Sequence, residues 1–503
     1  MKKKTRKIIK ASLTTLFGFG LLAFIISTSL INVGTNTSNL FAEIVLSDNT
    51  SVIADKSFSE TTFNGYRDFL NSRNEKELDR PVEDFREGFG LWRRPGTTNS
   101  EKETTFKGIF ENGKDIIIAP GFNSRDAINN ITQDPAYFNK GFLLLDAGLD
   151  SKARNASTVI FRMEQAGFQC GVAASEFLSV NESIFGKDDG ALKIGGFVGM
   201  PIPSTLDFLI GFQKGMVAWN EYNPGKTKVE WTTLGNNVDS YKSGSFGIGD
   251  GRQISKNLLN AGADVIMPIA GPQTLDTIAE IRLQNRPVIV VAADSAQEDN
   301  SGIQYPIPGL GSSIIKNADG KDSTNNNIIQ FSAVKKLDIA VQGTLTAISN
   351  LDGSNIATFD GSQYGGFGYT NIIALGEKGE SALGISQAGR AYFAQGLGGT
   401  DPGIVVSELP LNSTFKEMIG APTNTNAIQL FNTTSGIPGI GGSGAVDKAS
   451  IERYSNGLNN QKISIAPEID GKEVRLNGSH FAPPLPTMPF LLSDYGILRR
   501  KGI

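Results

Sequence analysis

Acidic and aromatic residues follow short apolar runs at several points along this chain of 503 residues. Asp48, Asp146 and Asp294 each stand at or just beyond the end of such a run, and Gly271 ends another. A carboxylate accepts hydrogen bonds from ring N–H groups and from sugar hydroxyls. Phe58, one loop beyond the first run, could stack on a flat ring. These residue types favour a site for a small polar molecule that carries a flat ring.

Two of these candidates also have simpler interpretations. Asp48 could be the capping residue of an ordinary loop between a strand and a helix. Phe208, a further aromatic candidate, falls in the first turns of a helix after the glycine-rich segment 195–203, where its periodicity favours the core over a ligand site. Ser57 is expected to cap a helix that starts near Phe58.

Catalytic residue types are scarce. The chain has one cysteine, Cys170, in a small-residue helical pattern expected to be buried, and one histidine, His480, in a tail expected at the surface. The segment 247–252 has the spacing GxGxG rather than GxGxxG, and no GxxxxGK[ST] motif occurs. The sequence therefore predicts a binding protein with no metal and no cofactor, not an enzyme.

The apolar runs indicate the elements that must position these residues. Short continuous apolar runs between helix-like stretches are typical of strands buried on both faces of a parallel sheet. The runs are 44–46, 116–118, 142–145, 194–199, 265–270, 288–293 and 328–331. Ligands of such sheets bind at the carboxyl ends of the strands, where the candidate residues lie.

Composition fits a folded protein of two or three domains, with 39% hydrophobic and 19% charged residues. The net charge of −4 argues against nucleic acid as a partner. Residues 1–10 hold six basic side chains, and Ala11–Val33 is an uncharged stretch long enough to span a bilayer. We expect a transmembrane anchor with the rest of the chain outside the cell. A signal peptide cleaved after Ala42 is the alternative.

The rest of the chain divides by pattern. Residues 34–42 form a polar spacer, and 43–350 carry the strand–helix rhythm. Residues 351–503 are a C-terminal extension of uncertain structure, rich in glycine and proline in places, which we expect partly to complete the preceding lobes.

Several ordered motifs resemble the basic membrane protein family of ABC-transporter solute-binding proteins, whose best-understood branch binds purine nucleosides. The opening Asp55-Lys56-Ser57-Phe58 resembles the family's DKSFNQ. The match continues through segments 167–174, 193–212, 262–266, 293–294 and 332–338. Together these motifs cover about residues 44–350.

The resemblance implies an α/β protein with a type I periplasmic-binding fold. In that fold two doubly wound parallel-sheet lobes are joined by three crossovers and close over a ligand in the cleft between them. It implies a receptor that binds a nucleoside and passes it to an ABC permease and its ATPase.

The resemblance also implies roles for single residues. Asp48 and Asp146 would read the edges of the base, and Phe58 and Phe208 would stack on it. Gly271, Asp294 and Lys335 would bind the ribose. The chain departs from the family at Ser59-Glu60 in place of Asn-Gln, at Phe63 in place of Trp, and in lacking the family's acylated cysteine. Riboflavin or another sugar-like solute, a surface antigen or adhesin, and an enzyme of nucleoside metabolism are the alternatives.

Overall fold

The computed structural model describes most of the predicted two-lobed region. The described residues are 41–349 without 56, 150–152, 154, 187–189, 236–237, 300–301, 303 and 318–319, then 367–373, 383–386, 461–464, 468–469 and 472–473. The predicted anchor Ala11–Val33, most of the spacer and His480 lie outside them. Among the described residues, no helix combines the length and the apolar character that crossing a membrane requires.

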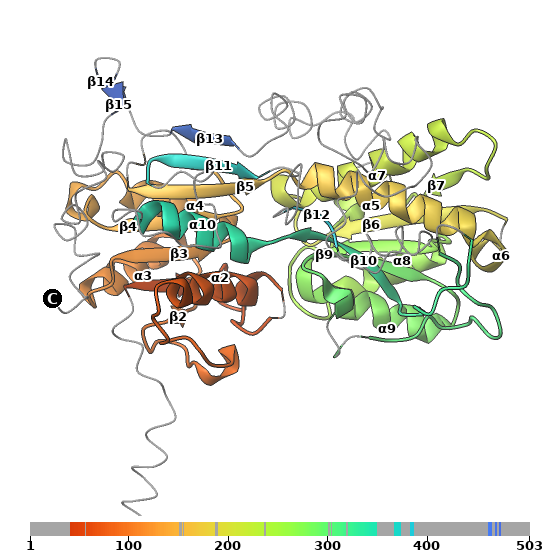
Figure 1. Ribbon diagram of the computed structural model, residues 1–503, viewed down its shortest axis with the longest axis horizontal. Coiled ribbons are helices and arrows are strands. Elements are labelled where there is room, and N and C mark those ends of the chain that lie inside the picture. The colour runs from red at the N-terminus through yellow and green to blue at the C-terminus, as the bar shows by residue number, and fades with distance from the viewer. Residues whose placement is uncertain are drawn as a thin grey trace, which may run out of the picture.

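The first lobe is built on a seven-stranded sheet with the order β13-β11-β5-β4-β3-β1-β2 (Figure 1). Its strands are parallel except for the antiparallel pair β11 and β13. The strands are β1 Ala42–Val45, β2 Trp92–Arg93, β3 Ile116–Pro120, β4 Gly141–Leu145, β5 Ala156–Phe161, β11 Tyr369–Ile373 and β13 Gln461–Ser464. The helices are α2 Phe58–Ser72, α3 Asn99–Glu111, α4 Arg125–Ile131 and α10 Leu337–Ser349.

The second lobe lies beside the first and holds a six-stranded sheet with the order β12-β10-β9-β8-β6-β7 (Figure 1). Only β12 runs antiparallel to its neighbour. The strands are β6 Leu192–Val198, β7 Val229–Trp231, β8 Val265–Ile269, β9 Ile289–Asp294, β10 Ile329–Lys335 and β12 Leu383–Ile385. The helices are α5 Met163–Val180, α6 Glu182–Phe185, α7 Pro203–Tyr222, α8 Gly251–Asn260 and α9 Thr274–Gln284. A separate pair, β14 Glu468–Ile469 and β15 Lys472–Glu473, forms a small antiparallel ribbon.

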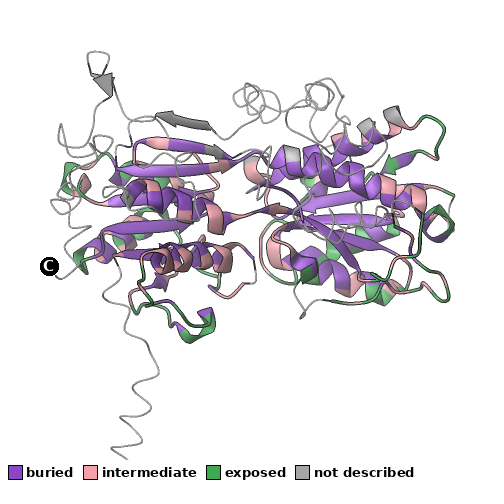
Figure 2. Cartoon of the chain, in the orientation of Figure 1, coloured by how far each residue is buried: buried purple, intermediate pink, exposed green. Residues whose placement is uncertain are grey.

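The central strands of both sheets are buried on both faces, as Figure 2 shows. In β3, Ile116 and Ile118 belong to one hydrophobic core and Ile117 to another, because successive side chains of a strand point to opposite faces. In the second lobe, Val265 and Met267 join the core that continues from the first lobe, and Ile266 joins a separate one. The expectation of two doubly wound parallel-sheet lobes is therefore confirmed.

Among the described elements, the chain passes between the lobes four times. It leaves β5 in the first sheet through Arg162 into α5, and it returns from β10 in the second sheet through Lys336 into α10, which packs on α2. Strand β11 belongs to the first sheet and the next described strand, β12, to the second. The third passage is therefore made between Ile373 and Leu383. A fourth follows β12, because β13 belongs to the first sheet again. All three of these strands lie beyond residue 350.

Helices α5 and α7 pack with their backbones in contact. A β-carbon at Gly167 or Gly171 of α5 would overlap a carbonyl oxygen of α7, and one at Gly211 or Gly215 of α7 would overlap a carbonyl oxygen of α5. The carbonyl that faces Gly167 belongs to Phe208. This close approach fixes the backbone of Phe208 against the helix that follows the first passage between the lobes.

All seven apolar runs form strands, which confirms the predicted rhythm. Strand β5 was not predicted, because its Ser157 and Thr158 interrupt the apolar pattern although both are fully buried. Their hydroxyl groups bond to β11. Thr158 Oγ1 donates to Thr370 Oγ1 at 2.8 Å, and Asn371 Nδ2 donates to Ser157 Oγ at 3.2 Å. A polar strand can be buried here because its partner strand is polar too.

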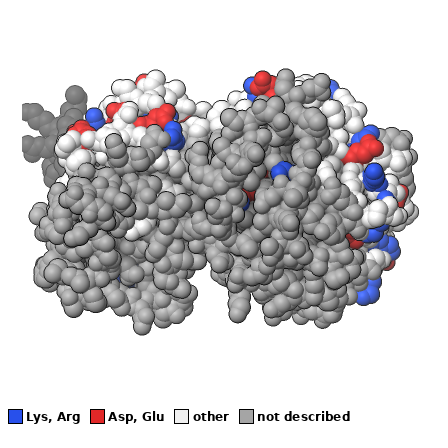
Figure 3. All heavy atoms as spheres, turned by 90° about the horizontal axis from the view of Figure 1, so that it is seen from above, with Lys and Arg blue, Asp and Glu red and all other residues white. Residues whose placement is uncertain are grey.

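The surface carries charges of both signs. On the face seen in Figure 3, described acidic and basic side chains are mixed at both ends of the molecule. This mixture agrees with the small net charge of −4.

Candidate functional site

Lys335 is the central side chain where the two lobes meet. It ends β10, at the second passage between the lobes, and only 4% of its side chain is exposed. Its Nζ donates to Asp146 Oδ2 at 2.8 Å and lies 2.9 Å from Asp294 Oδ1. Asp146 follows β4 of the first lobe, whereas Asp294 ends β9 of the second. One ammonium group therefore joins the carboxyl ends of the two sheets.

Two aromatic rings face the same ammonium group. Lys335 Nζ lies 4.9 Å from the ring centroid of Phe58 and 5.3 Å from that of Phe208. The two centroids are thus at most about 10 Å apart. We call Phe58, Asp146, Phe208, Asp294 and Lys335 the interlobe site.

Both aspartates of the interlobe site have left-handed backbones, with φ of 63° at Asp146 and 73° at Asp294. For an L-residue other than glycine this conformation costs about 1–2 kcal/mol, although aspartate tolerates it better than most. Strain of this kind gathers at ligand sites, where surrounding contacts hold it in place. At both positions it directs a carboxylate from a strand end toward Lys335.

Burial and charge act in opposition on the groups of this site. Burial lowers the pKa of Lys335, but the Asp146 and Asp294 carboxylates outweigh it and raise that pKa above its ordinary value. Burial raises the pKa of Asp146, although the Lys335 charge and a hydrogen bond from the Ser204 hydroxyl oppose it. Lys335 thus stays charged at neutral pH.

The other two predicted site residues make different contacts. Asp48 Oδ1 accepts from the Thr50 hydroxyl at 2.6 Å and from the backbone N–H of Thr50 and Ser51 at 2.8 and 2.9 Å. Burial raises the pKa of Asp48, but the hydrogen bonds from Thr50 and Ser51 outweigh it and lower that pKa. The carboxylate thereby closes its own loop, as the capping interpretation predicts. Gly271 begins the turn after β8 with φ of 52°, and a β-carbon there would meet open space.

Asp55, not Ser57, caps the helix that carries Phe58. The Asp55 carboxylate accepts from the backbone N–H of Ser57, Ser59 and Glu60 at 2.9, 2.9 and 3.1 Å. The predicted cap at Ser57 is wrong, since its hydroxyl is buried with no hydrogen-bond partner among the described residues. Asp55 lies three residues before the first residue of the helix. It can accept from three donors because Oδ1 accepts from Ser57 and Glu60 and Oδ2 accepts from Ser59.

Four further polar residues near the interlobe site were not predicted. Ser204 bonds to Asp146, and it lies four residues before Phe208 on α7, on the same helix face. Asp207, on the same helix, has a pKa raised well above its ordinary value by burial and by the nearby Glu164 and Asp146 charges, with Arg162 opposing. The four-residue spacing between Ser204 and Phe208 could have identified Ser204 from the sequence. The charged residues around Asp207 could not be identified in this way, because tertiary packing brings them together.

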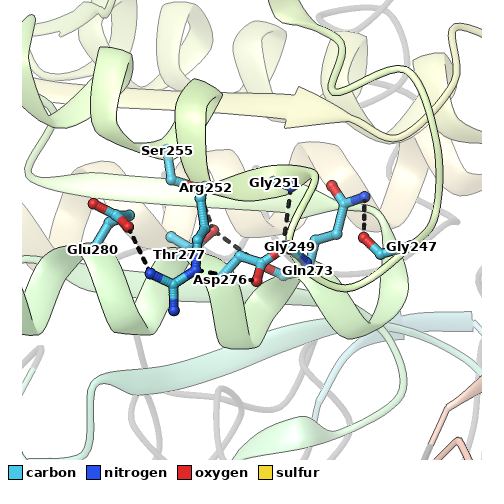
Figure 4. A network of polar contacts seen from close by, with 9 residues as sticks. All are labelled: Gly247, Gly249, Gly251, Arg252, Ser255, Gln273, Asp276, Thr277 and Glu280. Atoms are coloured by element: carbon cyan, nitrogen blue, oxygen red, sulfur yellow. Dashed lines mark hydrogen bonds and ion pairs between the residues drawn. The ribbon is translucent and has the colours of Figure 1, made fainter.

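The glycine loop 247–251 is held by side chains of helix α9 and of the turn that precedes it (Figure 4). Asp276 Oδ2 accepts from the backbone N–H of Gly249 at 2.7 Å and of Gly251, the first residue of α8, at 3.1 Å. Gln273 Nε2 donates to the Gly247 carbonyl oxygen at 2.9 Å. A carboxylate of this chain therefore occupies the donors that a nucleotide-binding loop would offer to a phosphate.

The described residues hold no cluster of three metal-binding side chains. Cys170 is fully buried, as predicted, and burial raises the pKa of its thiol well above its ordinary value. The interlobe site thus offers carboxylate acceptors, one ammonium donor and two aromatic rings. This set can hold a polar molecule with a flat ring.

The chain was compared with known proteins. The family model of the PnrA-like ABC transporter substrate-binding proteins matches residues 42–363. An uncharacterized lipoprotein of Mycoplasma pneumoniae is 32% identical over 428 residues, which are 70% of this chain and 62% of that protein. The chain therefore spans less than two thirds of that relative's length. An uncharacterized lipoprotein of Mycoplasma genitalium is 30% identical over 459 residues, covering 77% of this chain and 74% of that one.

A similar solved structure is a solute-binding protein of an ABC transporter system from Aeropyrum pernix. It is 17% identical, with a TM-score of 0.49, and the alignment covers 78% of this chain and 90% of that one.

Proposed function

Because the chain belongs to the PnrA-like ABC transporter substrate-binding proteins, we propose that it binds a nucleoside, with a purine as its base, between its two lobes. It passes this ligand to an ABC permease that is driven by a partner ATPase. The protein binds the ligand without changing it chemically.

The observation that supports this proposal best is the set of contacts around Lys335. One ammonium group lies within 3 Å of carboxylates from both lobes and about 5 Å from two aromatic rings. A nucleoside needs a flat surface for the base and paired polar groups for the ribose hydroxyls. The interlobe site offers both within the reach of one side chain.

The proposed roles follow from the chemistry of each group. Phe58 and Phe208 stack on the two faces of the base, and Asp146 accepts from its N–H donors. Asp294 accepts from ribose hydroxyls, and Lys335 donates to their oxygens, with Gly271 leaving room for the sugar. Asp48 also reads the base, through Oδ2, which accepts a longer bond of 3.4 Å from Ser47 Oγ, since its Oδ1 is engaged by its own loop.

We further propose that the binding region lies outside the cell and is held at the membrane by the segment Ala11–Val33. The two Mycoplasma relatives are named lipoproteins, but the one cysteine of this chain is buried Cys170. Anchoring is therefore expected without a lipid. The intact mass of protein extracted from membranes tests this, and a mature chain that starts near Glu43 and is released into the medium would contradict it.

Isothermal titration of the detergent-solubilised full chain tests the ligand. The panel holds purine and pyrimidine nucleosides, the matching free bases, ribose and riboflavin. We expect purine nucleosides to bind far more tightly than free bases, because a site built for hydroxyl groups is left with unpaired polar atoms when they are missing. Asp294→Ala should remove most of this preference.

The matched control is Asp322→Ala, which removes an exposed carboxylate of the same lobe that pairs with Lys316. It should leave every affinity unchanged. Equal affinity of the unmutated chain for base and nucleoside would contradict the ribose assignment. Tight binding of riboflavin alone would replace the nucleoside by a flavin as the ligand.

A further inference from the structure

A buried polar cluster lies directly behind Asp294 and involves none of the seven predicted ligand residues. It consists of Gln297 and Glu298, in the 3-10 turn Gln297–Asp299 after β9, together with Ser332 of β10 and Ser386 after β12. All four side chains are nearly inaccessible, with exposures of 6%, 4%, 0% and 3%.

The cluster holds the turn that follows Asp294. Gln297 Nε2 donates to the Ala293 carbonyl oxygen at 2.9 Å, and its backbone N–H donates to Ser332 Oγ at 3.2 Å. The Ser332 hydroxyl in turn donates to the Glu298 carboxylate. Ala293 and Gln297 flank the left-handed residue Asp294, so these bonds fix the chain on both sides of its strained backbone.

Glu298 also joins the two strands beside this turn. The Ser386 side chain bonds to it, and Ser332 and Ser386 exchange two bonds, Ser332 N–H to Ser386 Oγ at 3.0 Å and Ser386 N–H to the Ser332 carbonyl oxygen at 2.8 Å. Ser332 lies three residues before Lys335, and Lys335 pairs with Leu383 of β12. One carboxylate therefore connects the turn after Asp294 with the strand that carries Lys335.

We propose that Glu298 is a positioning residue that, through Ser332, holds Asp294 in the left-handed conformation in which it meets Lys335 and the ribose. This inference rests on the proposed function. Loss of Glu298 frees the turn, and the Asp294 backbone relaxes toward an unstrained conformation. The contacts of Asp294 and Lys335 with the ribose should therefore weaken. The contacts of Phe58 on α2 and Phe208 on α7 with the base should be retained.

The test compares the affinities of a purine nucleoside and of its free base, guanosine against guanine and adenosine against adenine. In Glu298→Ala we expect the nucleoside to bind about tenfold more weakly, by analogy with the loss that follows removal of a residue supporting a metal-binding side chain. The free base should keep its affinity, so the nucleoside-to-base ratio falls. Glu298→Gln, which can still accept from Ser332, should restore most of the ratio.

Asp299→Ala is the matched control, because Asp299 is the next residue of the same turn and is exposed. It should leave both affinities unchanged. Should Glu298→Ala not fold, Ser332→Ala removes the same link and should lower the ratio in the same way.

An unchanged ratio in the folded variants, or an equal loss of base and nucleoside affinity, would overturn the inference and leave the proposed function standing. No nucleoside binding by the unmutated chain would overturn the proposed function, and this inference with it.

Discussion

Phe58 is the residue of the interlobe site whose ring is least enclosed by the core. It packs against the main core but stays partly buried, whereas Phe208 is fully buried. Gly121, with φ of 89°, brings the end of β3 beside it, and a β-carbon there would contact Ser47 and the Phe58 ring. The ring is thus supported from one side and left available on another.

Phe58→Ala should weaken nucleoside binding by about 1–3 kcal/mol, the usual worth of one base–aromatic stack. Phe58→Trp should be milder, because an indole also presents a flat face. Titration calorimetry measures both variants. Phe89→Ala, at a half-exposed ring elsewhere in the first lobe, is the control and should bind as the unmutated chain does. Unchanged affinity in Phe58→Ala would leave this residue only a packing role.

Helix α2 is the element that sets the direction of Phe58, and its first turn depends on Asp55. Three backbone N–H groups at the helix start bond to this one carboxylate. A capping carboxylate satisfies donors that have no partner within the helix and interacts favourably with the helix dipole.

Asp55→Ala should lower the free energy of unfolding by about 0.5–2 kcal/mol, the range seen for lost helix caps. Nucleoside affinity should fall as well, since Phe58 is the first residue of the helix. Ser57→Ala is the control from the same turn. Because its hydroxyl is buried without a bond among the described residues, removal should not destabilise the fold. Denaturant unfolding measures both variants, and a larger loss in Ser57→Ala would reverse the assignment of the cap.

Elements with a simple hydrophobic pattern could be predicted from the sequence, and the others could not. Strands β3 and β9 are continuous apolar runs, whereas β5 is buried by pairing its polar side chains with β11, more than 200 residues away. The same limit applies to the site. Family motifs identified the residues that meet at Lys335, but Asp207 and Glu298 owe their surroundings to contacts between distant segments.

At the scale of the whole molecule, Lys335 connects the lobes. Its two carboxylate partners come from different sheets, and it stands where the chain passes from one lobe to the other. Removal of one member of a buried ion cluster leaves the others without compensation, which costs about 3–5 kcal/mol.

Lys335→Met should therefore lower the free energy of unfolding by about 3–5 kcal/mol at pH 7.5, roughly the cost of a broken buried pair. The difference in free energy of unfolding between the variant and the unmutated chain should become smaller as the pH falls. Burial already raises the pKa of Asp146 above its ordinary value of 3.8, and loss of the ammonium group raises it further. At a pH between the pKa of Asp146 in the unfolded chain and its raised pKa in the folded variant, the folded chain binds more protons than the unfolded chain. A lower pH therefore stabilises the variant.

Denaturant unfolding at pH 7.5 and near pH 5.5 measures this dependence. Lys316→Met is the control, because Lys316 forms an exposed pair with Asp322 and should cost less than about 1 kcal/mol at either pH. A loss of the same size at both pH values would show that Asp146 does not titrate as argued.

The contact between α5 and α7 limits which amino-acid substitutions this helix pair can accept. Gly167, Gly171, Gly211 and Gly215 lie where one helix backbone touches the other. Every amino acid except glycine carries a β-carbon, so every missense change at these four codons pushes the helices apart. Apolar neighbours such as Val172 can exchange with residues of similar volume. Substitutions are therefore tolerated at much of the α5–α7 interface, but not at the four glycines where the two helix backbones touch.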